Sequence, residues 1–454
     1  MEYINKICNG IKIMAIRVED RAYFPPESGY KTDGSWYWTT RAGSKPFMAY
    51  TPPEEPQYEQ QGYEGCVKYD QTAALRALVL NYSYTKDNNS LELANRLIRF
   101  MSKPGMWKDT TAEGFPGNEK GIWEGHFHAT MIALHGLTEF AVARDDETIK
   151  QFVRQAYDNA IRNTVIAMGW SPFWIPPGGF NRPKYLSGWC DTCNVADTIV
   201  EAVKLTDAGL GDYWDDVDRL VRNQLAEQQI CDLDKMRDVC GSGNKNDELL
   251  KKYLGGFGGL EATRAKPLTY GCCSANGPMG LYYAWHGITR FDKGVATVNM
   301  FLNRASDWMD VYSYLPYEGK VVLLNKKAHT ALVRIPAWID IKKISCLINQ
   351  KNVIPTRSEN YLVFSNLKAK DKIELQFPVQ EYREKHVIYG TEFTLTLRGS
   401  TVIDITPREY PPISQVVENY KKMYPVYQRN SFNAAKSPMK KARMFVADKL
   451  IDLQ

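Results

Sequence analysis

The sequence has no apolar run that approaches the roughly 20 residues of a membrane-spanning helix. Residues 1–20 lack the basic and then apolar layout of a secretory signal peptide. The net charge is only +5 over 454 residues, and Lys and Arg form no run longer than a pair such as Lys440-Lys441. A basic surface for nucleic acid is therefore not indicated. We expect neither a membrane partner nor a nucleic-acid partner.

A disulfide framework is not indicated either. The nine cysteines are an odd number spread through a long chain, whereas disulfide scaffolds are small and dense in cysteine. A reducing compartment fits this pattern, so we expect a cytoplasmic protein, or a periplasmic one whose export signal is absent from this sequence. The composition, 44% apolar and 24% charged, is typical of a soluble globular protein long enough for two domains.

Three regions follow one another along the chain. Residues 1–60 are rich in Pro, Gly and Tyr and predict an irregular N-terminal arm. Residues 61–293 carry apolar side chains at helical spacing, in pairs of segments joined by short polar turns. The expected helices after residue 66 include 126–143, 148–166, 191–205, 213–228 and 278–287. We interpret them as an (α/α) toroid or barrel that forms the catalytic domain.

The pattern changes after residue 293. Short alternating or β-branched runs are separated by turn residues, which predicts an antiparallel β-sandwich with a C-terminal tail over residues 294–454. The expected strands are 295–302, 321–324, 331–335, 344–348, 361–364 and 373–377, with two more about Arg398-Gly399 within 392–405. The fold class is therefore mainly α plus β, a helical toroid followed by a β-sandwich.

Two distant segments carry the residues that suggest chemistry. Cys190, Asp191 and Cys193 form one tight group, and Cys272 and Cys273 form another. Zinc accepts thiolate sulfur and carboxylate oxygen in tetrahedral sets, so three or four of these side chains could close on one zinc ion. Buried free thiols or a disulfide are the alternatives.

Aromatic residues crowd the Pro- and Gly-rich loop that leads into the first group. They are Trp170, Trp174, Phe180, Tyr185 and Trp189. Aromatic rings on loops offer flat apolar faces for sugars, although large aromatics also pack loops onto cores. Arg182 and Lys184 in the same loop could hold a uronate or sulfate, or could be solvated.

Several motifs occur here in the order of one known family. They are Gly125-His126 at a helix start, Asp191-Thr-Cys193, Cys272-Cys-Ser-Ala-Asn276, and Val333-Arg-Ile-Pro-Ala-Trp338. From about residue 66 onward the chain resembles glycoside hydrolase family 127, the zinc-thiolate β-L-arabinofuranosidases and their relatives. The resemblance implies an (α/α) barrel followed by a β-sandwich, with zinc at the base of the sugar site.

The resemblance also assigns roles. Asp191, Cys193 and Cys273 fall on the family's zinc ligands, and Cys272 falls on its nucleophile, which is also a ligand. A thiolate that attacks an anomeric carbon must be deprotonated at neutral pH, and zinc coordination provides this, whereas a free thiol with a pKa near 8.5 is mostly protonated.

Three further residues are candidates for substrate binding. His126 falls on the family's substrate-binding histidine, and Asp218 falls on its downstream glutamate. His128 lies two residues after His126, so on a helix the two would face different ways and one could point into the toroid. Histidines satisfied in the core are the alternative.

The sequence departs from the family at the proton donor. The family's acid/base glutamate lies in the loop before the acidic-x-Cys motif, but residues 170–189 contain no carboxylate here. Because departure of the sugar's leaving oxygen requires a proton, the remaining candidates are Glu124, Glu261 and Tyr185.

Three functions remain open. The leading hypothesis is a glycosidase that acts on glycan side-chain sugars with zinc as cofactor. The second is a polysaccharide lyase that uses Tyr185 and His126 on a uronate polymer. The third is a carbohydrate-binding protein without turnover. The expected partners are an oligo- or polysaccharide and, for oligomeric assembly, a second copy of the chain.

Overall fold

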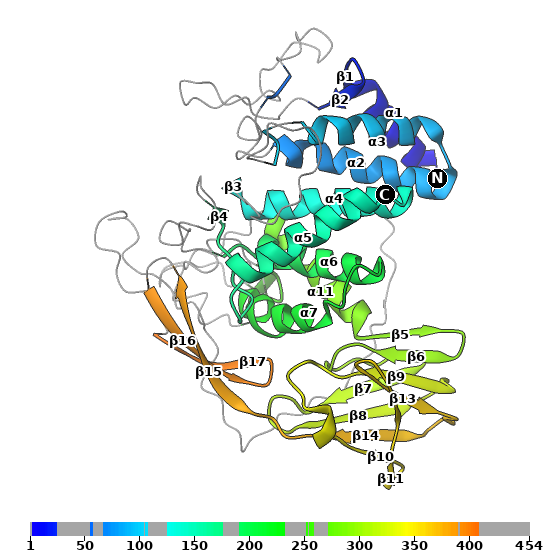
Figure 1. The fold of residues 1–454 in the computed structure, drawn as a ribbon, viewed down its shortest axis with the longest axis vertical. Coiled ribbons are helices and arrows are strands. Elements are labelled where there is room, and N and C mark those ends of the chain that lie inside the picture. The colour runs from blue at the N-terminus through cyan, green and yellow to red at the C-terminus, as the bar shows by residue number, and fades with distance from the viewer. Residues whose placement is uncertain are drawn as a thin grey trace. The chain divides into compact units, whose positions relative to one another are not determined.

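The computed structural model describes ten segments of the chain. They are residues 2–24, 55–57, 67–103, 105–107, 125–175, 190–231, 251–252, 254–257, 271–388 and 391–407. The chain divides into two compact units (Figure 1). The helical unit comprises Met1–Ile166, Trp170–Asp212 and Ile388–Gly390, and the mixed unit comprises Ala167–Gly169, Tyr213–Val387 and Thr391–Gln454.

Antiparallel helix pairs build the helical unit. Its elements are α1 (Glu2–Met14), β1 (Ile16–Val18), β2 (Arg21–Tyr23), α2 (Val67–Thr85), α3 (Asn88–Met101), β3 (Gly125–His126), α4 (Phe127–Arg144), α5 (Glu147–Thr164), β4 (Trp174–Ile175) and α6 (Thr192–Asp207). Helix α2 packs against α3 and α4, and α4 packs against α5 and α6. Helix α4 is therefore buried along most of its length.

Local sequence fixes the ends of these helices. Asp145 adopts a left-handed conformation at the end of α4, and the side chain of Asp146 accepts a hydrogen bond from the Ile149 N–H to start α5. Asp87 caps α3 in the same way through the Asn89 N–H. Such caps satisfy backbone groups that a helix leaves unpaired at its ends.

The prediction of an irregular arm over residues 1–60 is wrong for its first part. Residues 2–14 form helix α1, and residues 16–23 form the hairpin β1–β2. Helix α1 buries Cys8, whose thiol contacts the carbonyl of Ala77 on α2. The prolines of the arm all lie from Pro25 onward, so its average composition hid a helical segment that contains none.

The mixed unit begins with helices. These are α7 (Trp214–Leu220), a π-helical turn (Val221–Leu225), α8 (Ala226–Gln228) and α11 (Gly271–Ile288). Helix α11 was expected to begin at Pro278, but it begins at Gly271 and includes the cysteine pair. The proline resembled a helix start because proline is common at the first helical position, yet here it lies inside the helix.

One buried cation, Arg304, caps the C-terminal end of α11. Arg304 donates from Nη1 to the backbone carbonyls of Trp285, His286 and Thr289 at 2.7–2.9 Å. Burial lowers the pKa of Arg304 to about 10. A cation at this position stabilises the carbonyls that the last turn of a helix leaves unpaired.

After α11 the described chain consists mainly of strands, with one 3-10 helical turn at Ile341–Lys343. The strands are β5 (Thr289–Asp292), β6 (Val295–Val298), β7 (Met309–Ser313), β8 (Lys320–Asn325), β9 (Thr330–Arg334), β10 (Ser345–Ile348), β11 (Lys351–Val353), β12 (Thr356–Ser358), β13 (Tyr361–Ser365), β14 (Lys372–Gln376), β15 (Glu381–Ile388), β16 (Thr391–Arg398) and β17 (Thr401–Thr406). Two five-stranded sheets have the orders β11-β10-β14-β8-β7 and β12-β13-β9-β6-β5, and β15-β16-β17 forms a third.

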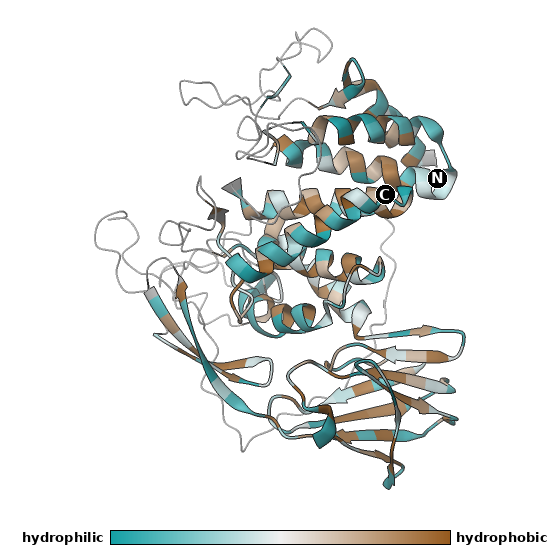
Figure 2. Cartoon of the chain, viewed as in Figure 1, coloured by the Kyte–Doolittle hydropathy of each residue, from teal (hydrophilic) through white to brown (hydrophobic). Residues whose placement is uncertain are grey.

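The two five-stranded sheets form a β-sandwich. Each buries one apolar face, with Val321 and Leu323 of β8 on one sheet and Ala331 and Val333 of β9 on the other fully buried. The inner strands are largely hydrophobic in Figure 2. All described strand pairs are antiparallel except β6 and β9, which pair in parallel.

The expected class, a helical region followed by a β-sandwich, is confirmed. The first strand starts at Thr289, a few residues before the expected change at 293–294. Closure of the helices into a toroid remains a prediction. Among the described segments, no helix has both the length and the hydropathy needed to cross a membrane.

Candidate metal centre

The start of helix α6 presents the first two candidate ligands. Asp191 is the N-cap residue, in an extended conformation, and its Oδ1 accepts a hydrogen bond from the Cys193 N–H at 3.3 Å. Both side chains are buried. Short acidic side chains favour this position because they satisfy free N–H groups of the first turn. The cap therefore fixes Asp191 beside Cys193.

The first turn of helix α11 presents the other two. Cys272 is exposed and Cys273 is buried, and their sulfurs lie 3.9 Å apart. A helix N-terminus carries a partial positive charge, which favours thiolates over thiols. Among the described residues no cysteine forms a disulfide, and these cysteines are Cys8, Cys190, Cys193, Cys231, Cys272, Cys273 and Cys346.

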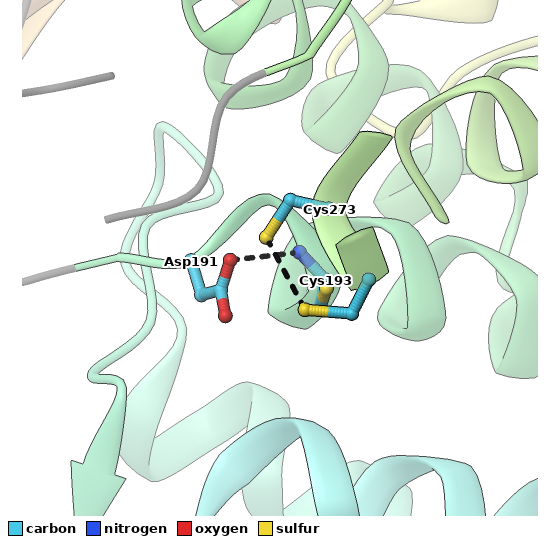
Figure 3. Close-up of side chains that lie close together, drawn as sticks. Asp191, Cys193 and Cys273 are labelled. Carbon is cyan, nitrogen blue, oxygen red and sulfur yellow. Dashed lines mark hydrogen bonds between the residues drawn. The ribbon is translucent and has the colours of Figure 1, made fainter. Parts of the chain in front are cut away.

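Four side chains could hold one metal ion. Asp191, Cys193, Cys272 and Cys273 each offer one ligand atom, and these atoms lie within 4.8 Å of one another. Three of the residues are labelled in Figure 3. Two sulfurs bound to zinc at about 2.3 Å in a tetrahedral set lie roughly 3.8 Å apart, so the cysteine pair has a suitable separation. Three sulfurs and one carboxylate oxygen form a donor set that suits zinc.

His126 and His128 lie together near the start of α4. His126 belongs to β3, pairs with Trp174 of β4 and precedes the first helical residue. The assumption that both histidines are helical is wrong, because His126 precedes the helix and only His128 belongs to it. Their ring centroids lie 5.2 Å apart, and the ring of His126 also contacts Phe173 at 4.4 Å.

Sequence reasoning missed the partner of His128. Its Nδ1–H donates to Oδ2 of Asp197, a fully buried residue of α6. Farther along α4, His135 donates from Nε2 to the backbone carbonyl of Asp197 at 2.9 Å. Burial holds the pKa of His135 well below its ordinary value, so this histidine is neutral. An acid four residues after Cys193, among apolar neighbours, was the available signal.

Asp218, the other expected substrate-binding residue, has close partners of its own. Its Oδ1 accepts from Arg222 Nη2 at 2.7 Å, and its Oδ2 accepts from Arg222 Nε at 3.2 Å and from Ser400 Oγ at 2.6 Å. The bond from Ser400 connects α7 to the turn before β17. Substrate binding by Asp218 remains a prediction.

Of the remaining expected site residues, only Trp174 lies in the described part of the chain. Trp174 lies on β4, and nothing further is described of its side chain. Glu124, Glu261, Tyr185, Arg182 and Trp189 lie outside the described residues.

Comparison with known proteins identifies the fold. No family model and no curated protein sequence matches this chain. Among solved structures, a family 127 β-L-arabinofuranosidase from Geobacillus stearothermophilus T6 is 16% identical, covering 72% of this chain and 57% of that one, with a TM-score of 0.49. A second family 127 β-arabinofuranosidase is 17% identical, covering 72% and 55%, with a TM-score of 0.54.

A third similar structure is described as a glycoside hydrolase. It is 15% identical, covering 72% of this chain and 59% of that one, with a TM-score of 0.53. This chain thus spans less than two thirds of the length of each of these structures. By its fold, the chain resembles the β-arabinofuranosidases of glycoside hydrolase family 127, as its sequence motifs predict.

Proposed function

We propose that this protein is a glycoside hydrolase that releases arabinofuranoside-like side-chain sugars from glycans. The observation that supports it most directly is the cluster of Asp191, Cys193, Cys272 and Cys273, with all four ligand atoms within 4.8 Å. The similarity of fold to a family 127 β-arabinofuranosidase supports the choice of substrate class. The lyase alternative depends on Tyr185, which lies outside the described residues.

Within this proposal the four side chains have distinct tasks. Asp191, Cys193 and Cys273 are buried and would hold a zinc ion, whereas Cys272 is exposed and can meet a substrate. Zinc would keep the Cys272 sulfur deprotonated at neutral pH. The start of α11 adds to this effect because its partial positive charge favours a thiolate.

The Cys272 thiolate would then act as nucleophile. Its electron pair forms a bond to the anomeric carbon while the bond to the leaving oxygen breaks, and that oxygen takes up a proton. Water next attacks the anomeric carbon, and the carbon–sulfur bond breaks to restore the thiolate. The free sugar keeps the configuration of the glycoside because two displacements occur.

The test compares Cys272→Ala with the unchanged chain on aryl β-L-arabinofuranosides. We expect the activity to fall by at least about 1,000-fold, because alanine has no group that can bond to the anomeric carbon. Cys231→Ala removes another exposed thiol and serves as the matched control, which should retain activity. Retained turnover in Cys272→Ala would rule out the thiolate mechanism, and no turnover of any glycoside by the unchanged chain would rule out the hydrolase.

A further inference from the structure

We infer that His128, oriented by Asp197, is the proton donor and acceptor of this site. The inference rests on the proposed function. It answers a specific gap, because residues 170–189 contain no carboxylate that could protonate a leaving oxygen. His128 transfers the proton, and Asp197 is a positioning residue that acts through it.

The starts of α4 and α6 place this pair close to the candidate metal ligands of the helical unit. The two helices pack against each other. Both are also tied to one short segment: the Phe127 N–H donates to the Phe173 carbonyl at 3.0 Å, and the Asn194 side chain donates to the Pro172 carbonyl at 2.9 Å. The same short segment therefore holds the start of α4, which carries His128, and the start of α6.

The spacing of residues on α6 places Asp197 on the same face of the helix as a candidate metal ligand. Asp197 follows Cys193 by four residues, so the two side chains lie on the same face of the helix, one turn apart. Asp197 in turn contacts His128 of the neighbouring helix. A candidate metal ligand, a carboxylate and an imidazole thus follow one another across the α4–α6 contact.

The carboxylate prepares the imidazole for proton transfer. Asp197 is fully buried, and its Oδ1 has no hydrogen-bond partner among the residues that the structure describes. A buried carboxylate with so few donors stabilises a positive charge on the histidine that it contacts. It also fixes Nδ1 as the donor to Asp197, so that Nε2 is the atom that exchanges protons with the substrate.

Two aromatic rings lie near His128. The ring of Tyr69 on α2 lies 5.7 Å away, and that of His126 lies 5.2 Å away. His135 is farther along α4 and is neutral, since burial lowers its pKa. Its bond is to the backbone of Asp197 and not to the carboxylate. Of the two histidines of α4, His128 contacts the carboxylate of Asp197 and His135 does not.

The proton balance over both steps is complete. When the bond to the leaving oxygen breaks, that oxygen keeps the electron pair and takes the proton from Nε2 of the His128 imidazolium, which becomes neutral imidazole. In the second step, Nε2 takes a proton from the attacking water as its oxygen bonds to the anomeric carbon. The imidazolium is thereby restored, and no other reactant is needed.

The experiment measures kcat/KM for a series of aryl arabinofuranosides whose leaving phenols range from dinitrophenol to phenol. The variants are His128→Gln and Asp197→Asn, with His135→Gln as the matched control on the same helix. Removal of a proton donor should cost about 100-fold or more with phenol, which needs protonation, but less than about 10-fold with dinitrophenol, which does not. The decline of kcat/KM at alkaline pH should also disappear in His128→Gln.

Each outcome decides the matter. A steep dependence on the leaving group in both His128→Gln and Asp197→Asn, with His135→Gln parallel to the unchanged chain, supports the inference. Equal losses for every phenol in folded, metal-containing His128→Gln would mean a structural role and overturn it; if that variant fails to fold, Asp197→Asn decides in the same way. An unchanged chain that turns over no glycoside overturns the proposed function instead, and the inference with it.

Discussion

Arg334 of strand β9 donates from Nη1 to Oδ1 of Asp215 in the first turn of helix α7, at 2.8 Å. The other oxygen of Asp215 accepts from the Ala337 N–H at 3.0 Å. Trp338 follows directly and packs against Gly399, whose φ of +58° lies in the left-handed region. The motif Val333–Trp338 thus connects the sandwich to helix α7 of the mixed unit, and its role in these contacts is structural.

Replacement of this arginine should destabilise the mixed unit. Arg334 is buried, whereas the Asp215 side chain is about one third exposed, so part of the lost interaction is recovered by solvation. We expect Arg334→Met to lower the free energy of unfolding by about 2 kcal/mol, measured by urea denaturation. Lys343→Met removes an exposed ion pair with Asp340. This variant should change the free energy of unfolding by less than about 0.5 kcal/mol. Equal effects of the two variants would contradict this role for Arg334.

Much of the sandwich could be predicted because its signals are local. The runs around β8, β13 and β14 alternate or are β-branched, and each is bounded by turn residues. The order of strands could not be predicted, since the chain passes repeatedly from one sheet to the other. The parallel contact of β6 with β9 joins strands separated by two others in sequence, which no local pattern encodes.

At the site, too, local sequence patterns indicated some residues, whereas contacts between distant segments could not be predicted. Spacing and family motifs indicated Asp191, Cys193, Cys272 and Cys273, because ligand types recur at short intervals. The pairing of His128 with Asp197 depends instead on two helices that come together in the fold, 69 residues apart in sequence. No periodicity within one helix could reveal it.

Gly287 should tolerate no side chain. A Cβ at this position would lie 2.4 Å from the buried ring of Trp214. Because Trp214 is enclosed, we expect Gly287→Ala to destabilise the protein by about 1–3 kcal/mol, measured by urea denaturation. Gly10 of α1 has no heavy atom within 4 Å of such a Cβ, so Gly10→Ala should instead stabilise by up to about 1 kcal/mol. A neutral Gly287→Ala variant would show that Trp214 can move aside.

Metal removal should change both stability and thiol reactivity. If Asp191, Cys193, Cys272 and Cys273 hold zinc, the purified protein should contain about one zinc per chain. Chelation should then lower the melting temperature and raise the number of thiols that react with a thiol reagent, since ligation protects them. Cys193→Ala should contain no zinc and should show no response to the chelator, whereas Cys346→Ala, a buried thiol of β10, should behave as the unchanged chain. A zinc-free native protein would contradict the metal centre.

Glu201 should make stability depend on pH. Its side chain is fully buried on α6 and accepts a hydrogen bond from Thr138 Oγ1 at 2.5 Å. Burial raises its pKa from 4.5 to about 7, so the folded protein favours the protonated acid. The stability from this group is complete below the unfolded pKa near 4.5 and is lost as the pH rises to about 7.

Glu201→Gln removes this dependence because an amide of similar size stays neutral and can still accept from Thr138. Relative to the unchanged chain, the variant should gain up to about 3 kcal/mol in unfolding free energy between about pH 5 and pH 8. Urea denaturation across this range measures the gain. Glu147→Gln, at an exposed carboxylate of α5, should show no such gain. Parallel curves for Glu201→Gln and the unchanged chain would mean that Glu201 ionises in the folded protein at its ordinary pH, and the buried carboxylate would then need a cation or water beside it.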